Sequence, residues 1–471
     1  MQNNNPQTKK MSRGMKILWA AVAVLAAAAL FFAGFFVYYL TLPSEVRSLL
    51  WIKDKIQSEY YEDVSDDEFW DAVLDGAVSV LDQYSAYYTA DEYDVVVDSS
   101  RGISQGLGLS FFSGSNMIAE AAYNSPAFYA RPQGEDAAWS TGLETGMYVT
   151  GAGASAGEIE DTFRLVSGTG DTAVYSYSAL STALSGYSVG DTVYLRVSAV
   201  SGHETENCEI VPVTLARYTE SYVLYAADGE AYIYAYTDGA GEWKNVSEYV
   251  SVDEKVSGDA AYIRLSSFYG NAAAEFGRAA QAYKEDGKTK LLFDLRNDGG
   301  GSVSVMQGIA AYLMKDAQSD TEPVMRAVYG NGREEIYLAG GDYYDEYFAG
   351  SEIYVAANRN TASASEALIG VMLSYDTIGY GNIFITELPN STKPARTYGK
   401  GIMQTTFRNS LTGEAIKLTT ATIHWPDEAG TCIHDRGITT ADGAIPTERA
   451  ETFGDYGDSE LAWILLQVAA A

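Results

Sequence analysis

Hydrophobic residues follow several distinct patterns along the chain. The stretch from Ile17 to Leu40 is apolar and uncharged, and it is long enough for a helix across a bilayer. Between Pro43 and Asp98 apolar residues recur at helical spacing, and Ser65 with the acidic residues after it predicts a helix start. From Arg101 to Thr219 short apolar runs alternate with glycine turns, which is typical of short strands.

The part of the chain after Ser221 predicts alternating strands and helices. Short apolar runs of the buried-strand type are Tyr262–Leu265, Lys290–Leu295 and Ser351–Ala356. Segments with helical spacing of apolar residues are Asn271–Lys284 and Ser302–Met314. The order of strand, glycine turn and helix implies βαβ units, hence an α/β core.

The chain of 471 residues is too long for a single ordinary core, so several domains are expected. We predict a multidomain α+β protein with four parts. These are a tail and transmembrane anchor (1–44), a helical segment (45–100), a β-rich domain (101–219) and an α/β core (220–471).

Charge is distributed unevenly. The net charge is -32, yet the first 44 residues hold four basic residues and no acidic one, so the rest carries -36. The acidic surface argues against nucleic acid as a partner. The basic flank of the apolar stretch predicts a cytoplasmic N-terminus, with a single pass through the cell membrane and the remainder outside. The lipid bilayer is thus an expected partner of this helix.

A cleaved signal peptide is the alternative for the apolar stretch. The stretch is long for a signal peptide, and no clean small-x-small site follows Phe36, so we favour an uncleaved anchor. The two cysteines, Cys208 and Cys432, provide no disulfide framework and are expected as separate thiols. The three histidines lack metal-ligand spacing, so we predict no metal site and no cofactor.

Candidate chemistry centres on one serine, one lysine and one glutamine. Ser363 lies in the small-residue run T-A-S-A-S-E, Lys400 lies between glycines, and Gln404 follows four residues later. A serine hydroxyl is a weak nucleophile until a base takes its proton, and a lysine can be that base if burial lowers its pKa. These residue types suggest peptide hydrolysis by acyl transfer. A Ser-His site would need His424 or His434, and we favour Lys400.

Three motifs in order resemble the signatures of the C-terminal processing (tail-specific) serine peptidases of the S41 type. The family motifs read D-L-R-x-N-x-G-G, G-S-A-S-A-S-E and T-F-G-K-G-x-x-Q, and this chain has D-L-R-N-D-G-G-G from Asp294, then T-A-S-A-S-E and T-Y-G-K-G-I-M-Q. The resemblance implies that Ser363 is the nucleophile and Lys400 the general base, while Gln404 orients the lysine. It also implies a crotonase-like (ClpP-like) fold for the core.

The same resemblance assigns the remaining site residues. The N–H groups of Gly300 and Ala364 are expected to form the oxyanion hole, with the choice of glycine open by one position. Glu366 and Thr397 are expected to support the turn and the lysine loop. The motif L-D-Q-Y-S-A-Y-Y, from Leu81, is similar to the family's L-D-P-x-S-x-Y, and we expect a structural role for it.

The loop of Gly106, Leu107, Gly108 and Leu109 resembles the carboxylate-binding loop of PDZ domains, which captures a peptide C-terminus as an added strand. Further pieces follow in the order of a PDZ domain: Ser125–Ala127, Gly142–Met147, a helix over Tyr177–Leu184 and a strand over Thr192–Val197. The segment Phe128–Ser140 is an expansion relative to that pattern. The resemblance implies protein or peptide substrates with apolar C-termini.

We therefore predict a membrane-anchored, extracytoplasmic serine endopeptidase whose PDZ-like domain gates a Ser-Lys site. The alternative is a non-catalytic, PDZ-type peptide-binding relative. The intact Ser363, Lys400 and Gln404 argue against this alternative, and the expanded PDZ-like segment and an insertion around Leu388 to Arg396 argue for it. Self-association and an activating partner remain open.

The C-terminal segment from Leu461 to Ala471 ends in small apolar residues. Two interpretations are open. One is capture of this tail by the protein's own site, and the other is a packed C-terminal helix, which we favour.

Overall fold

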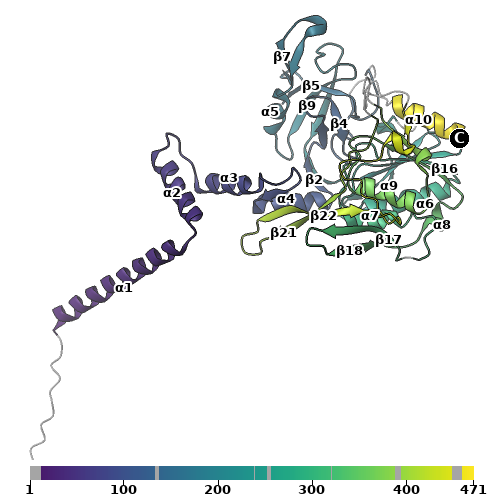
Figure 1. The fold of residues 1–471 in the computed structure, drawn as a ribbon. Coiled ribbons are helices and arrows are strands. Elements are labelled where there is room, and N and C mark those ends of the chain that lie inside the picture. The colour runs from purple at the N-terminus through teal and green to yellow at the C-terminus, as the bar shows by residue number, and fades with distance from the viewer. Residues whose placement is uncertain are drawn as a thin grey trace, which may run out of the picture. The chain divides into compact units, whose positions relative to one another are not determined.

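The chain divides into two units, Met1–Leu81 and Asp82–Ala471. The computed structural model describes residues 12–132, 137–237, 239–251, 256–319, 321–387, 394–447 and 459–471 (Figure 1). Most of the predicted insertion between Leu388 and Arg396 lies outside the described residues. The division at residues 100 and 219 stays a prediction.

The first unit is helical. Its helices are α1 (Arg13–Thr41), α2 (Ser44–Glu59) and α3 (Asp66–Val78). Helix α1 has 29 residues and is apolar enough to cross a membrane, either as an anchor or as a signal sequence. The start predicted for α3 is confirmed: the Ser65 N–H donates to Glu68, and the Glu68 N–H donates back to the Ser65 hydroxyl, which is a capping box.

The second unit begins with a short strand and a helix, β1 (Ala86–Tyr88) and α4 (Ala90–Ser100). Strand β1 interrupts the helical pattern expected up to Asp98, because it pairs antiparallel with β22 (Ala415–His424), a strand from the far end of the chain. The spacing of apolar residues along a helix cannot reveal such a pairing.

A β-rich part with its own hydrophobic core follows. A four-stranded sheet has the order β10-β9-β5-β6, and helix α5 packs beside it. The elements of this part are β2 (Ile103–Gly106), β3 (Leu109–Phe111), β4 (Ile118–Ala121), β5 (Tyr148–Gly153), β6 (Glu160–Asp161), β7 (Arg164–Ser167), β8 (Val174–Ser176), α5 (Ala179–Ser185), β9 (Thr192–Ser198), β10 (Glu209–Thr214) and β11 (Ala216–Thr219). The predicted helix and strand are confirmed as α5 and β9.

An eight-stranded sheet forms the centre of the remaining part, in the order β14-β13-β12-β15-β16-β19-β20-β23. The strands from β15 to β23 are parallel, and those from β12 to β14 form an antiparallel edge. The strands are β12 (Val223–Ala227), β13 (Glu230–Thr237), β14 (Ala240–Asn245), β15 (Ala260–Leu265), β16 (Lys290–Asp294), β19 (Glu352–Ala357), β20 (Ile383–Ile385) and β23 (Ile445–Pro446).

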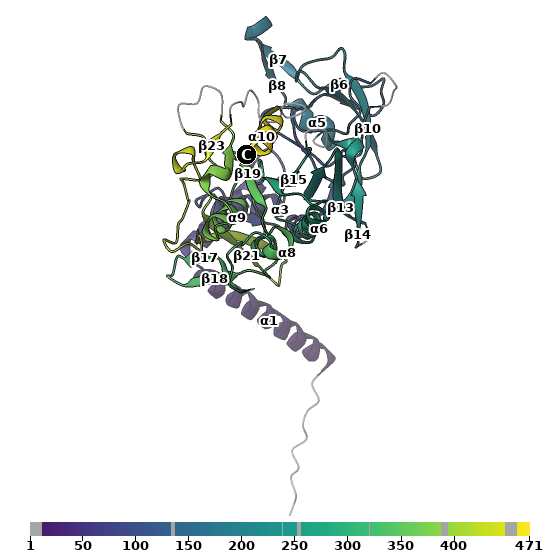
Figure 2. The ribbon, with the colours of Figure 1, turned by 90° about the vertical axis from the view of Figure 1, so that its right-hand side faces the viewer.

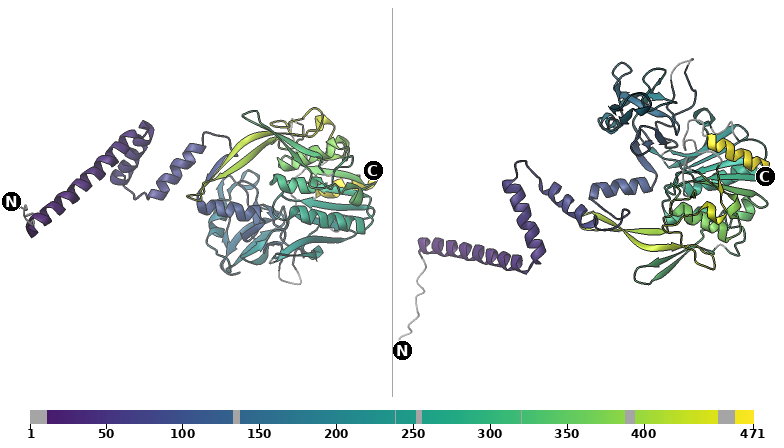
Figure 3. Two further views of the ribbon diagram at one scale, coloured as in Figure 1. Left: turned by 90° about the horizontal axis from the view of Figure 1, so that it is seen from below. Right: turned by 45° about the horizontal axis from the view of Figure 1, so that its top comes forward.

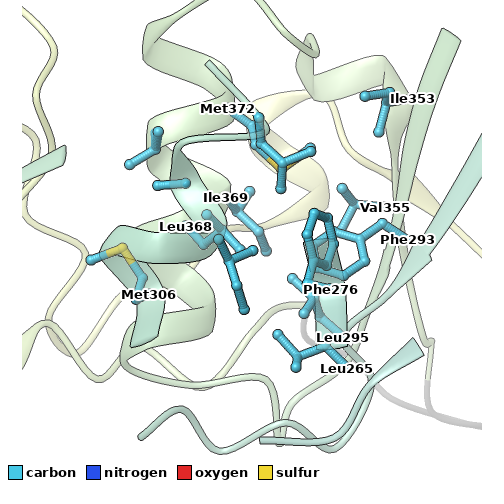
Figure 4. Packing of buried hydrophobic residues seen from close by; sticks show 14 of the residues in the cluster. Leu265, Phe276, Phe293, Leu295, Met306, Ile353, Val355, Leu368, Ile369 and Met372 are labelled. Atoms are coloured by element: carbon cyan, nitrogen blue, oxygen red, sulfur yellow. The ribbon is translucent and has the colours of Figure 1, made fainter. Parts of the chain in front are cut away.

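Helices cover both faces of this sheet, because successive side chains of its buried strands point to opposite sides. On β16, Phe293 joins the core under helices α6, α7 and α9, while Leu292 joins the core under α10. Figure 2 shows α10 on one side of β15 and β19, and α6 and α9 on the other. Figure 4 shows Leu368 and Ile369 of α9 beside Phe276 of α6 and Phe293. These helices are α6 (Ala272–Glu285), α7 (Val303–Ala310), α8 (Tyr344–Tyr347), α9 (Ala364–Ser374) and α10 (Ser459–Ala470).

A second sheet carries the loop of residues 397–401 that contains Lys400, called the lysine loop. Its order is β1-β22-β17-β18, and β21 pairs with β22 to form a long antiparallel hairpin (Figure 3). The strands not yet defined are β17 (Pro323–Tyr329), β18 (Glu334–Leu338) and β21 (Ile402–Arg408). Lys400 lies just before β21, so this hairpin fixes where the lysine loop ends.

The C-terminal segment is a packed helix, as favoured from the sequence. The apolar face of α10 is buried against the sheet, with Leu461, Ile464, Leu465 and Val468 in the core. Ion pairs also fix the first turn of α10. Arg296 Nη1 lies 3.0 Å from Glu460 Oε2 in this turn, and Arg296 Nη2 lies 2.7 Å from Asp294 Oδ2 at the end of β16.

Replacing Glu460 by alanine is expected to lower the free energy of unfolding by about 3 kcal/mol, because Arg296 would stay buried and lose its ion pair with Glu460. Chemical denaturation of the purified protein measures this. Glu346→Ala is the matched control, because the pair of Glu346 with Lys284 is half exposed and should contribute less than about 1 kcal/mol. Equal losses in the two variants would contradict the prediction.

Candidate active site

Ser363 lies where β19 turns into helix α9. Its backbone has φ 58° and ψ −114°, an uncommon conformation for any residue except glycine. Two backbone N–H groups hold the turn. The Ser363 N–H donates to the side-chain Oε2 of Glu366 (3.1 Å), and the Ala362 N–H donates to the Asp298 carbonyl (2.9 Å). The side chain is half-buried at the positive end of the helix.

Glu366 connects the serine turn to the lysine loop. Its buried carboxylate accepts N–H groups of Ser363, Gly399 and Lys400 and the hydroxyl of Thr397. Burial raises the pKa of this carboxyl, and these four hydrogen bonds oppose the rise. Glu366 and Thr397 thus lie where the expected supporting role requires them.

Lys400 is half-buried beside the serine turn. Burial lowers the pKa of its amine, the charge of Lys417 lowers it further, and Asp82 and Glu366 oppose the change. Within the described residues the amine makes no ion pair and no hydrogen bond to Ser363. It lies instead over the ring of Tyr84, 4.7 Å from the ring centre.

Tyr84 is a site residue that the sequence did not reveal. It belongs to the Leu81–Tyr88 motif, for which a structural role was expected, and the pairing of β1 with β22 brings it to the lysine. Its hydroxyl lies 3.0 Å from that of Tyr398, and burial raises its pKa to about 12, so the ring stays neutral. No local pattern could have indicated this contact with a residue more than three hundred positions away.

Gln404 lies on β21 and lines the same cavity as Ser363 and Lys400. Its amide donates to Thr419 Oγ1 across the β21–β22 pair (3.0 Å). Among the described residues it forms no hydrogen bond with Lys400, so the structure brings Gln404 to the cavity without the direct contact expected for orienting the lysine.

The glycine loop after β16 lies against the serine turn. Gly300 has φ 95°, and a Cβ built there would lie 2.8 Å from the Ala364 nitrogen and 2.9 Å from Ser363 Cβ, so only glycine fits. Of the two expected oxyanion donors, the Ala364 N–H has no hydrogen-bond partner within the described residues, whereas the Gly300 N–H donates to Asp298 Oδ1 (2.8 Å).

Asp298 is the second residue that the sequence analysis passed over. It is fully buried, and burial raises the pKa of its carboxyl well above the ordinary value. A signal was present in the sequence, because Asp298 stands at the asparagine position of the D-L-R-x-N-x-G-G motif.

A cavity of about 800 Å³ joins these groups. Ser363, Lys400 and Gln404 line it, together with Gly300 and Ala364. Its walls combine polar and apolar residues, and the apolar ones include Met306, Met325, Met403 and Ile423. A volume of this size is suited to a short stretch of peptide.

A second cavity, of about 850 Å³, lies in the β-rich part. The predicted carboxylate-binding residues Gly106, Leu107, Gly108 and Leu109 all line it. Helix α4, strand β11 and Leu184 of α5 complete the walls. The structure therefore brings the four predicted residues to one groove.

Comparisons with known proteins show which proteins this chain resembles. Residues 259–380 match peptidase family S41. A "Probable CtpA-like serine protease" of Staphylococcus saprophyticus is 23% identical over 84% of this chain and 64% of its own length. A carboxyl-terminal-processing protease of Synechocystis is 28% identical over 40% of this chain and 38% of its own length.

The chain thus spans between about a third and two thirds of the length of these curated relatives. Among solved structures, the photosystem II D1 C-terminal processing protease overlaps 83% of this chain and 87% of its own, with a TM-score of 0.43 and 19% identity. The relatives named above are serine or carboxyl-terminal-processing proteases. Residues 259–380 are thus similar to peptidase family S41, and the chain has C-terminal processing proteases among its relatives.

Proposed function

We propose that this protein is a serine endopeptidase of the C-terminal processing type, with Ser363 as nucleophile and Lys400 as general base. The observation that carries the proposal is the shared cavity. It is lined by a serine in a strained turn, a lysine with a lowered pKa, and Ala364, whose N–H has no hydrogen-bond partner among the described residues. Protein substrates follow from this activity.

In the proposed reaction the neutral Lys400 amine takes the proton of the Ser363 hydroxyl while the serine oxygen bonds to the peptide carbonyl carbon. The carbonyl oxygen becomes an anion near the Ala364 N–H and the glycine loop. The lysine then passes its proton to the leaving amine as the peptide bond breaks. In the second half of the reaction, Lys400 takes a proton from water while the water oxygen bonds to the acyl carbon. The lysine then returns the proton to the Ser363 oxygen as the ester bond breaks.

This reaction requires two local changes from the arrangement described above. Lys400 must leave the Tyr84 ring and reach the serine hydroxyl, and the Gly300 N–H must leave Asp298 if it is to serve as the second oxyanion donor. We infer that the structure corresponds to a resting state of the site.

The β-rich part is proposed to be a PDZ-like domain that captures apolar C-termini. The groove lined by Gly106–Leu109 supports this, because backbone N–H groups of a glycine loop can hold a terminal carboxylate while the peptide adds as a strand. The parallel strands of the core are proposed to be crotonase-like.

Helix α1 is proposed to be an uncleaved anchor, with the N-terminus in the cytoplasm and the peptidase outside. The length of α1 and the basic residues before its apolar part support this topology. Protease added to intact cells should remove the peptidase part and leave the N-terminus protected.

A peptide-binding relative without activity is the second candidate. The absence of a hydrogen bond between Lys400 and Ser363 in the described part of the chain favours it. The two functions differ in one experiment: the full-length protein in detergent is incubated with an unfolded reporter that ends in apolar residues, and with the same reporter ending in charged residues. Cleavage of the first reporter supports the peptidase, while binding without turnover supports the relative.

Gly300→Ala is expected to lower kcat/KM by about a hundredfold or more and to lower the melting temperature, because the new methyl would clash with the backbone of the serine turn at a positive φ. Reporter cleavage and thermal unfolding measure the two effects. Gly299→Ala is the matched control, since a Cβ there meets nothing within 4 Å. Similar losses in both variants would show that the loop tolerates no side chain and would contradict the assignment to Gly300.

A further inference from the structure

The Asp298 carboxyl is an unusual group to find beneath an oxyanion loop. Its Oδ1 accepts the Gly300 N–H, and within the described residues its Oδ2 has no hydrogen-bond partner. Asp294, four positions earlier, is also buried, but its carboxylate is paired with the Arg296 guanidinium. The loop therefore contains one carboxyl that is ion-paired, that of Asp294, and one that forms no ion pair with any described residue, that of Asp298.

The backbone of Asp298 fixes the loop to the serine turn. Its carbonyl accepts the Ala362 N–H and the Ser365 hydroxyl, each at 2.9 Å. The Gly300 carbonyl, in turn, accepts the Phe268 N–H and the Ser267 hydroxyl. The Gly299–Gly300 peptide unit lies between these two carbonyls, so it can turn its N–H away from Asp298 Oδ1 without breaking the hydrogen bonds that they accept.

The charges that reach Asp298 come from several elements. Glu120 on β4 favours the neutral form, and Arg264 on β15 favours the charged form. The Gly300 N–H and the Ser365 hydroxyl of α9 also favour the charged form. Burial outweighs these effects, so the pKa of Asp298 lies well above its ordinary value.

We propose that Asp298 is a positioning residue that works as a neutral carboxylic acid: its oxygen holds the Gly300 N–H in the empty site and yields it to the oxyanion during the reaction. The proposal rests on the proposed peptidase function. No covalent bond changes at Asp298, and its proton stays in place throughout.

The physical argument is a competition between two acceptors for one N–H group. Hydrogen bonds to a charged acceptor are roughly twice as strong as those to a neutral one, so a carboxylate would retain the N–H. A negative charge buried beside the serine turn would also oppose the developing oxyanion. A neutral acid avoids both effects, because the oxyanion is then the stronger acceptor.

The test compares the pH dependence of kcat in full-length wild type, Asp298→Asn and Asp298→Ala. The asparagine keeps the acceptor oxygen and cannot ionise, whereas the alanine removes the acceptor. We expect wild-type kcat to fall toward alkaline pH, the asparagine variant to lose that fall, and the alanine variant to lose about tenfold or more at neutral pH with KM within about twofold. Asp294→Asn is the control, and it should lower stability without removing the alkaline fall.

Superposable profiles of wild type and Asp298→Asn would overturn the proposal. So would a loss in Asp298→Asn at neutral pH as large as that in Asp298→Ala, because the charge itself would then be needed. A second measurement does not depend on activity: the amide nitrogen shift of Gly300 in Ser363→Ala protein should titrate, and Asp298→Asn in that background should abolish the titration. A flat shift overturns the proposal, whether or not the peptidase activity is found.

Discussion

Replacing Ser363 by alanine is expected to lower peptide hydrolysis by about 10⁶-fold, to the level of the uncatalysed background under ordinary assay conditions. The substitution removes the Ser363 Oγ, which would form the acyl-enzyme. The backbone N–H of residue 363 keeps its hydrogen bond to Glu366 Oε2, so the turn stays in place. The melting temperature should therefore change by less than about 2 °C. Cleavage of the unfolded reporter with the apolar C-terminus, followed by mass spectrometry, measures the rate.

The exposed Ser410 provides the matched control, because Ser410→Ala removes the same atom from a turn outside the cavity. Cleavage by Ser363→Ala at the wild-type rate would refute Ser363 as nucleophile. If neither wild type nor variant cleaves but both bind the reporter, the peptide-binding relative is the better description. The apolar-tail and charged-tail reporters then show whether recognition depends on the C-terminus.

Local sequence patterns predicted the elements of the core closely. The apolar runs at Tyr262–Leu265 and Lys290–Leu295 correspond to β15 and β16, because a strand buried on both faces needs an uninterrupted apolar run. The helix predicted over Ser302–Met314 ends earlier, at Ala310. Its last turn tightens, with N–H groups of Tyr312 and Leu313 bonding three residues back, and apolar spacing does not reveal where such tightening begins.

The sequence predicted only those parts of the candidate site that are short, contiguous motifs. The motifs around Ser363 and Lys400 could be recognised because each forms a single turn or loop. The contact of Tyr84 with Lys400 depends on a strand pairing between distant segments, which sequence spacing does not encode. The partner of Gln404 depends on the register of β21 against β22, so Thr419 could not be foreseen either.

Lys400→Met is expected to lower hydrolysis by about 10⁴-fold, because methionine matches the length of the lysine stem and offers no base. The same change should stabilise the folded protein at neutral pH. Burial lowers the pKa of the folded lysine, so the folded state holds the proton less tightly than the unfolded state. The charged lysine therefore destabilises the fold, and methionine removes that cost.

The sign of the pH dependence follows from the same shift. As pH rises through the lowered pKa toward the unfolded value of about 10.4, wild type regains stability. The difference in the free energy of unfolding between wild type and Lys400→Met therefore becomes smaller. Denaturation at a series of pH values measures this difference, and Lys315→Met, at an exposed lysine outside the cavity, serves as the control. Lys417→Met should raise the pKa of Lys400, because it removes a nearby positive charge, and should move the acidic limb of kcat to higher pH. The prediction is contradicted if the difference in the free energy of unfolding stays constant with pH and the acidic limb of kcat does not move in Lys417→Met. Lys400 would then be an ordinary solvated lysine, and another residue would have to be the base.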